Sequence, residues 1–121
     1  MAVQPTPRTV QVESRSLADV ATAVWRLSTK LADESSPARR HAQTAMDALA
    51  EAGIEVQSYR DQGFDPGLAI RVLAFQPRPG LARETIVETV RPTIYLHGKV
   101  IGMGEVIVGT PVSESTAEGE R

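Results

Sequence analysis

The sequence predicts an α+β fold in which an N-terminal antiparallel helical hairpin is followed by a small all-β domain. Apolar residues from Leu17 to Leu31 recur at alternating spacings of three and four, which is typical of helices that pack on other helices. After Gly53 the pattern changes to the alternation of a half-buried strand. Near the end of the chain, two β-branched runs flank His97-Gly98, which indicates a β-hairpin.

These patterns divide the chain into four segments. We expect a disordered lead-in at residues 1–15, a helical hairpin that serves as the dimerisation module at 16–53, a β-domain at 54–109 and a disordered tail at 110–121. Pro5 and Pro7 lie among mostly polar residues in the lead-in, and the tail is polar and acidic. Both compositions favour disorder.

The first helix is expected to begin at Ser16, because Ser16 and Asp19 resemble a capping box, and to end near residues 33–36. Trp25 departs from the apolar stripe of this helix and is either a flank of the core or an exposed contact. The stripe consists of Leu17, Val20, Val24, Leu27 and Leu31.

The second helix is expected to have Ser36 as its N-cap, Pro37 at its first position and Gly53 as a left-handed residue after its end. Its apolar side is rich in alanine and contributes little buried area. Two such helices cannot bury their stripes alone, so we favour a dimeric four-helix bundle over packing within a monomer. The expected dimer interface comprises Leu17, Val20, Val24, Leu27, Leu31, Ala42, Ala45, Met46 and Leu49.

The β-domain is expected to contain short strands separated by turns rich in glycine and proline. Val90 ends a β-branched run before Pro92, and the chain turns at Gly98 before it enters the closing strand at Val106–Val108. The remaining expected segments are a strand at 54–57, a turn at 61–67, a strand at 68–75 and a loop at 76–80.

The composition limits the classes of function. The 121 residues carry a formal net charge of −2, which argues against a nucleic-acid binder. Cysteine is absent, so disulfides and thiolate sites are excluded. Apolar runs fall short of the ~18 residues that a membrane span needs, and no signal peptide is recognised. We therefore expect a soluble cytoplasmic protein. Aromatic residues are only 4%, which favours oligomerisation as a source of additional core.

No residue pattern indicates an enzyme, a cofactor or a metal site. His41 stands among charged helix residues, and His97 at the hairpin has no nucleophile beside it. The run from Gly98 to Gly104 lacks the Gly-Lys-Ser/Thr order and the following helix of a phosphate loop. Bent strands with tight turns account for its glycines.

The segment from about Ala38 to Val108 resembles the GrpE family, the nucleotide exchange factors of DnaK-type chaperones. The resemblance covers the end of the second helix, a Phe-Asp-Pro step at Phe64, the strand before the hairpin, the hairpin with its basic residue Lys99, and the closing strand. It implies a homodimer whose β-domain docks on the nucleotide-binding domain of a DnaK-type chaperone and releases ADP. The implied partner-binding residues are Lys99, Val90, Gly98, Val106 and Val108.

The sequence departs from the family pattern at several positions. Thr93-Ile94 replaces a Gly-Tyr pair, Gly102 stands where an arginine is usual, and Ala69 stands where a histidine is frequent. The long N-terminal stalk helix is missing, which implies a short form. The alternative is a dimeric scaffold or regulatory module that keeps a GrpE-like fold without exchange activity. Two roles for Lys99 stay open with equal weight. It is either a cation that anchors a partner or a solvated lysine of the hairpin.

Overall fold

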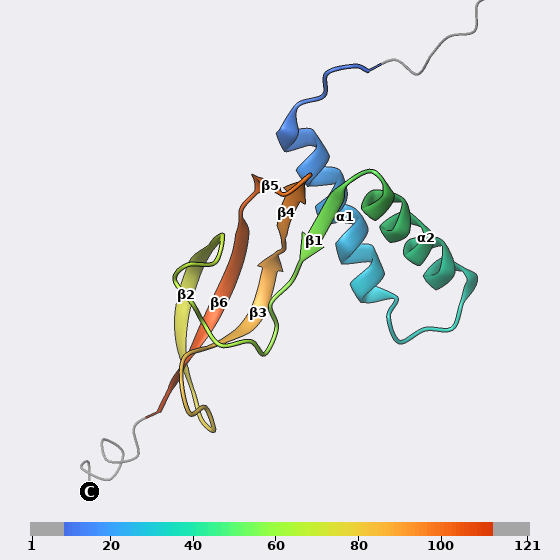
Figure 1. The fold of residues 1–121 in the computed structure, drawn as a ribbon. Helices are drawn as coiled ribbons and strands as arrows, with labels where there is room; N and C mark the ends of the chain where they lie inside the picture. Colours follow the sequence, from blue (N-terminus) through green and yellow to red (C-terminus); the bar gives the residue numbers. More distant parts are fainter. Residues whose placement is uncertain (1–8, 113–121) are drawn as a thin grey trace, which may run out of the picture.

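The computed structural model describes residues 9–112, which form an α+β fold of two helices and two small sheets (Figure 1). The helices precede the strands, as the sequence predicts. The elements are α1 (Ser14–Lys30), α2 (Pro37–Glu51), β1 (Ile54–Gln57), β2 (Ile70–Arg78), β3 (Thr85–Arg91), β4 (Thr93–Leu96), β5 (Lys99–Gly102) and β6 (Gly104–Pro111).

Each sheet has three strands. Sheet A has the order β1-β4-β5, and both of its pairings are antiparallel. Sheet B has the order β2-β6-β3, in which β6 runs parallel to β2 and antiparallel to β3. The central strands are therefore β4 in sheet A and β6 in sheet B.

One long antiparallel hairpin contributes to both sheets. One arm is β3 followed by β4, and the other arm is β5 followed by β6 (Figure 1). Pro92 interrupts the first arm because proline cannot donate a ladder hydrogen bond, and Met103 lies between the strands of the second arm. Register shifts at three places along the pairing increase the local twist. The hairpin thus bends from sheet B into sheet A.

A buried hydrogen-bond network stands at this bend. The hydroxyl of Tyr59 donates to Thr93 Oγ1 at 2.5 Å, and Thr93 Oγ1 donates to the carbonyl oxygen of Ala69 at 2.8 Å. The same carbonyl accepts the backbone N–H of Gly104 at 3.1 Å. Tyr59 and Thr93 are almost completely buried. Because buried polar groups need partners, these bonds fix how the residue before β2 meets the first residues of β4 and β6.

Helix α1 packs on sheet A through small side chains. A Cβ built on Gly102 would lie 2.9 Å from Cβ of Ala18, so glycine allows β5 and α1 to approach closely. Ala18 and Ala21 share a core with Ile54 and Ile94, and α2 adds Leu49 at its edge. The sheet B core is separate and contains Tyr59, Ile86, Val106 and Val108. We call the core between α1 and sheet A the helix-side core. It contains residues from both sides of the predicted domain boundary between residues 53 and 54.

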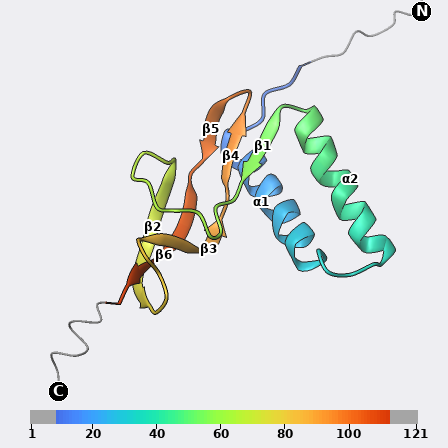
Figure 2. The same ribbon diagram turned by 60° about the horizontal axis from the view of Figure 1, so that its bottom comes forward.

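The apolar stripe predicted for α1 is not the face that the chain buries. Ala18, Ala21 and Thr22 are the buried residues of α1, whereas Val20 and Leu27 are 55% and 53% exposed. Helix α2 lies beside α1 and runs in the opposite direction, which both ribbon views show (Figures 1 and 2). The helices thus follow one another as a hairpin, while part of the stripe faces away from both α2 and the sheets.

The predicted cap of α1 is wrong. The helix begins at Ser14 with Glu13 as its N-cap, so Ser16 lies inside it and no capping box forms. Asp19 instead pairs with Arg91 of β3. This start also places residues 14 and 15, which were expected in the lead-in, within the helix.

The predicted ends of α2 are confirmed. Ser36 is the N-cap, Pro37 is the first helical residue, and Gly53 has a φ of +87° after the C-cap. The Ser36 hydroxyl makes no capping bond, and its buried Oγ has no partner among the described residues.

The strand boundaries differ from the prediction at both ends of sheet B. Strand β2 continues through Pro77 into the segment expected to be a loop, because residues 76–78 pair with β6. Strand β6 continues to Pro111, since Thr110 pairs with Pro77, so residues 110 and 111 of the expected tail belong to a strand. The rest of that tail, 113–121, and the lead-in residues 1–8 lie outside the described residues.

The close approach at Gly102 gives a stability prediction. Gly102→Ala should lower the free energy of unfolding by about 1–3 kcal/mol, because the new methyl group must push β5 away from Ala18. Chemical denaturation followed by circular dichroism measures this change. Gly67→Ala is the matched control, because a Cβ there meets only the Asp65 side chain, at an ordinary 3.4 Å or more. Equal stability of the two variants would contradict the packing described.

Candidate functional site

The tip of the β4–β5 hairpin is a two-residue turn. His97 and Gly98 both have positive φ angles, 49° and 85°, which the tight hairpin turn requires. The His97 backbone N–H donates to the Gly53 carbonyl oxygen at 2.8 Å, and its imidazole covers Gly53 so closely that a Cβ there would overlap the ring. His97 therefore braces the turn against the end of α2, and the predicted turn at Gly98 is confirmed.

Lys99 follows this turn on the surface. Gly98, Lys99 and Val100 are exposed, with Val100 at 43%. Within residues 9–112, Lys99 takes part in neither of the two ion pairs. We call Gly98, Lys99 and Val100 the hairpin tip. It offers one cation beside apolar surface, on a turn held in place by a backbone hydrogen bond.

The structure does not bring the other predicted partner-binding residues to this tip. Val106 and Val108 are fully buried in the sheet B core, so their assignment to a docking surface is wrong. The cause is strand alternation, which directs both side chains to the inner face. Val90 lies in β3, roughly 20 Å from the hairpin tip along the arm formed by β3 and β4 at ~3.3 Å per residue.

The predicted dimer residues divide between two environments. Ala42 is buried, and Leu49 packs against the helix-side core, so both already contribute within the chain. Ala45 and Met46 are partly buried. In α1, Val20 and Leu27 are more than half exposed, while Leu17, Val24 and Leu31 are partly buried. The side chains available to a second copy are therefore mainly those of the α1 stripe.

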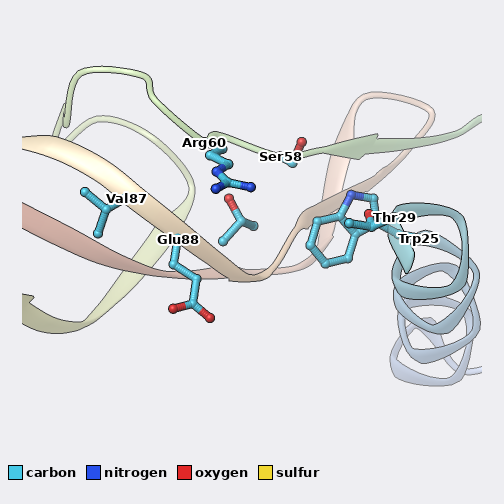
Figure 3. A pocket seen from close by; sticks show the side chains of 7 residues that line it. Trp25, Thr29, Ser58, Arg60, Val87 and Glu88 are labelled. Atoms are coloured by element: carbon cyan, nitrogen blue, oxygen red, sulfur yellow. The ribbon is translucent and has the colours of Figure 1, made fainter. Parts of the chain in front are cut away.

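A groove that the sequence did not predict lies between α1 and β3. We call it the α1–β3 groove (Figure 3). The indole of Trp25 projects from α1 toward the strands and is partly buried, so it is neither a core residue nor a free surface residue. The groove is lined by Trp25, Arg26, Thr29, Lys30, Ser58, Arg60, Val87, Glu88, Thr89 and Val90.

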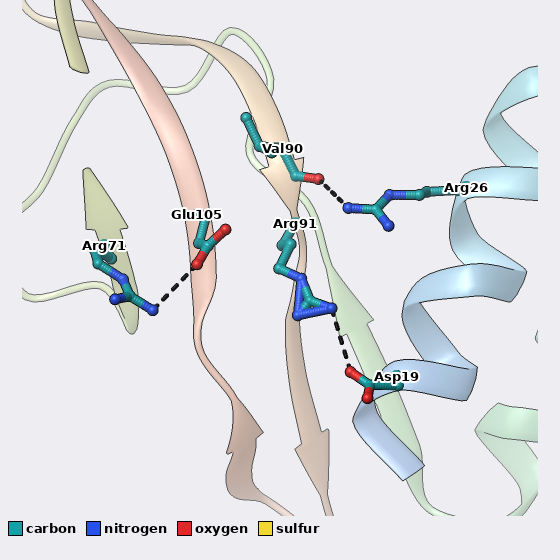
Figure 4. Close-up of polar contacts among 6 residues, drawn as sticks. All are labelled: Asp19, Arg26, Arg71, Val90, Arg91 and Glu105. Atoms are coloured by element: carbon teal, nitrogen blue, oxygen red, sulfur yellow. Dashed lines mark hydrogen bonds and ion pairs between the residues drawn. The ribbon is translucent and has the colours of Figure 1, made fainter. Parts of the chain in front are cut away.

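Two polar contacts join α1 to β3 (Figure 4). Arg26 Nη2 donates to the Val90 carbonyl oxygen at 3.1 Å, and Arg91 Nη2 lies 3.2 Å from Asp19 Oδ1. Both contacts are solvent-accessible, so the ion pair contributes only about 0.2–1 kcal/mol. Their effect is mainly to set the position of α1 relative to β3. The sequence contained one signal of this groove, namely Trp25, which lies on the sheet-facing side of α1 rather than in its apolar stripe.

The described residues contain no cluster of three or more histidine, aspartate or glutamate side chains that could hold a metal ion. Burial raises the pKa of the Tyr59 hydroxyl above its ordinary value of 10.0, although its hydrogen bond with Thr93 opposes this shift. Tyr59 is therefore a neutral structural group at physiological pH. Neither described helix has the length and apolar character of a membrane span.

No protein-family model matches this chain, and no curated protein sequence matches it.

Proposed function

We propose that this chain is a GrpE-like co-chaperone, which forms a homodimer, docks its β-domain on the nucleotide-binding domain of a DnaK-type chaperone and promotes ADP release. The observation that carries the proposal is the exposed hairpin tip, where Lys99 stands beside Val100. The order of the elements supports it, because two helices followed by a small β-domain match the segments of the resemblance.

The exposed part of the α1 stripe supports the proposed dimer. Val20 and Leu27 lie on one face of α1 and are more than half exposed, although side chains of this kind gain from burial. Pairing of two such stripes, with Ala45 and Met46 of α2 at the side, would form the proposed four-helix bundle. The sheet-facing side of α1 would remain bound to its own β-domain.

The proposed activity is a linkage between two binding equilibria. An exchange factor must bind the open, nucleotide-free chaperone more tightly than the ADP-bound form. A thousandfold decrease in the affinity of the chaperone for ADP requires roughly 4 kcal/mol of differential binding. A rigid turn that presents one cation and a small apolar surface can contribute to such a difference without a catalytic group.

A dimeric scaffold or regulatory module without exchange activity is the second candidate, and Gly102 favours it. The family places an arginine at this position, but here the position faces Ala18 of α1 at close range. An arginine side chain could not project toward a partner from this site without moving the helix.

The proposed dimer predicts a response to charge in the stripe. Leu27→Asp should raise the dissociation constant of the dimer by more than about a hundredfold, because each copy loses an apolar contact and buries a carboxylate. Sedimentation equilibrium measures the dissociation constant. The helical circular dichroism signal should stay unchanged, because Leu27 lies outside both cores.

Arg15→Asp is the matched control for this dimer test. Arg15 is exposed and lies in the first turn of α1, where an acidic side chain is compatible with the helix dipole. Its direction differs from that of the stripe by about half a turn at 3.6 residues per turn. A wild-type chain that is monomeric at all concentrations, or a Leu27→Asp chain that dimerises normally, would exclude this interface.

The proposed docking surface predicts that Lys99→Glu reduces the acceleration of ADP release by about tenfold or more, because the cation that anchors the hairpin tip becomes an anion. Stopped-flow release of fluorescent ADP from a DnaK-type chaperone measures this rate. Arg40→Glu makes the same charge change at an exposed position of α2, and this variant should still accelerate ADP release. Full activity of Lys99→Glu would remove the docking assignment, and an inactive but folded wild-type dimer would favour the scaffold.

A further inference from the structure

We propose that the α1–β3 groove binds a small aromatic carboxylate, whose ring lies against the Trp25 indole and whose carboxylate is held by Arg60. The part of the groove concerned lies between Trp25 of α1 and the residues Ser58, Arg60 and Thr89, and we call it the indole cavity. It shares no residue with the hairpin tip or the α1 stripe. The site therefore does not depend on the proposed exchange activity.

The size of the indole cavity suits a small molecule. Its volume is about 430 Å³, which falls within the range of roughly 300–1,000 Å³ that small-molecule sites occupy. Three separate segments of the chain, namely α1, the residues after β1, and β3, supply its walls (Figure 3). A compact ligand can thus contact all three segments at once.

The backbone around the cavity excludes an added strand as the occupant. The segment 58–62 lies along the outer side of β3, where Asp61 and Gln62 bond with the backbone of Ile86. Because this segment covers the strand edge, the cavity presents side chains to a ligand rather than an open row of main-chain groups. The ligand must therefore be recognised by side-chain chemistry.

The wall formed by α1 is aromatic. The indole of Trp25 projects from α1 toward the strands and is partly buried (Figure 3). Aromatic rings attract one another in stacked or edge-to-face arrangements, and this attraction adds to the effect of the buried area. Trp25 therefore favours a planar ring over an aliphatic group of the same size.

The opposite wall carries a cation. Arg60 is exposed, and within residues 9–112 it takes part in neither of the two ion pairs. Figure 3 shows its guanidinium extending into the space between the segment after β1 and β3. The planar fork of N–H donors in a guanidinium matches the two oxygens of a carboxylate. Arg60 can thus hold a carboxylate attached to the ring.

The neighbours of Arg60 reinforce the preference for an anion. Thr89 Oγ1 accepts the Tyr59 N–H at 3.1 Å, and a hydroxyl that accepts one bond can still donate its own proton. Ser58 supplies a second hydroxyl. Glu88 is the one carboxylate among the lining residues, and its side chain extends away from Arg60 (Figure 3). This wall therefore offers donors to a ligand that only accepts.

These features together define the probe for an experiment. The volume selects a compact molecule, Trp25 selects a ring, and Arg60 selects a carboxylate. The compound 2-naphthoate meets all three requirements. Its amide, 2-naphthamide, keeps the ring and the shape but removes the charge, so it is the matched control ligand.

The experiment is a heteronuclear NMR titration of the whole chain with each compound. Trp25 is the single tryptophan, so its indole N–H gives one signal that reports on the cavity itself. We expect 2-naphthoate to shift this signal saturably, with a dissociation constant below about 1 mM for a ligand of this size. We expect 2-naphthamide to bind about tenfold more weakly, because it forms no charge-assisted hydrogen bonds with Arg60.

Two charge variants test where the carboxylate binds. Arg60→Gln should raise the dissociation constant of 2-naphthoate about tenfold and leave that of 2-naphthamide within about twofold. Arg40→Gln removes the same charge at an exposed position of α2 and should leave the binding of both compounds within about twofold. Circular dichroism checks that both variants are folded.

A third variant tests the contact with the ring. Trp25→Leu should weaken the binding of both compounds by about fivefold or more, because both present the same ring to the indole. The backbone amide signal of Thr89 then replaces the indole signal as the readout. If Trp25→Leu does not fold, the comparison of Arg60→Gln with Arg40→Gln decides the proposal.

Four results would overturn the proposal. The Trp25 signal of the folded wild-type protein could stay unchanged at about 10 mM 2-naphthoate, a concentration that would saturate the expected site. The two compounds could bind equally, or Arg60→Gln and Arg40→Gln could weaken binding equally, which would indicate an effect of net charge alone. Shifts confined to signals away from the cavity would place the ligand elsewhere. Loss of exchange activity in Lys99→Glu with normal binding of 2-naphthoate would contradict the exchange function without affecting this site.

Discussion

The hydroxyl of Thr93 is the contact on which the arrangement of the two sheets depends. It accepts a hydrogen bond from Tyr59 and donates one to Ala69 where the long hairpin bends from sheet B into sheet A. Gly104 must lack a side chain because a Cβ there would overlap Thr93 Oγ1. Since Thr93 is fully buried, an unpaired hydroxyl would be costly, and the bend is held in one geometry. Sheet A then carries α1, so the position of the helix follows from the same bend.

The elements were predictable from the sequence because their signals are local. The spacing of apolar residues indicates α1, Pro37 and Gly53 mark the limits of α2, and His97-Gly98 marks the hairpin turn. The face of α1 that packs on the sheet was not predictable in the same way. Ala18 and Ala21 are small, and their importance appears only when Gly102, far away in the sequence, is placed opposite them. The largest side chains thus indicated the helix but not its contact with the sheet.

The candidate sites were predictable to a smaller extent for a similar reason. Lys99 lies next to a turn with a strong local signal, and its exposure was expected from that turn. Val106 and Val108 are implied as docking residues by the resemblance alone, whereas strand alternation directs both side chains into the core. The α1–β3 groove requires that Trp25 and Arg60 lie together, and only the tertiary fold brings them there. A tryptophan outside the apolar stripe was the one local indication.

The central claim is that Thr93 joins the two sheets into one cooperative unit, and hydrogen exchange in Thr93→Val tests it most directly. Valine has nearly the same shape but leaves the Tyr59 hydroxyl without its partner, at a cost of about 1–3 kcal/mol. The account predicts that the amides of Ile94 in sheet A and Val106 in sheet B lose protection together and by similar factors. Lost protection in one sheet with unchanged protection in the other would contradict it.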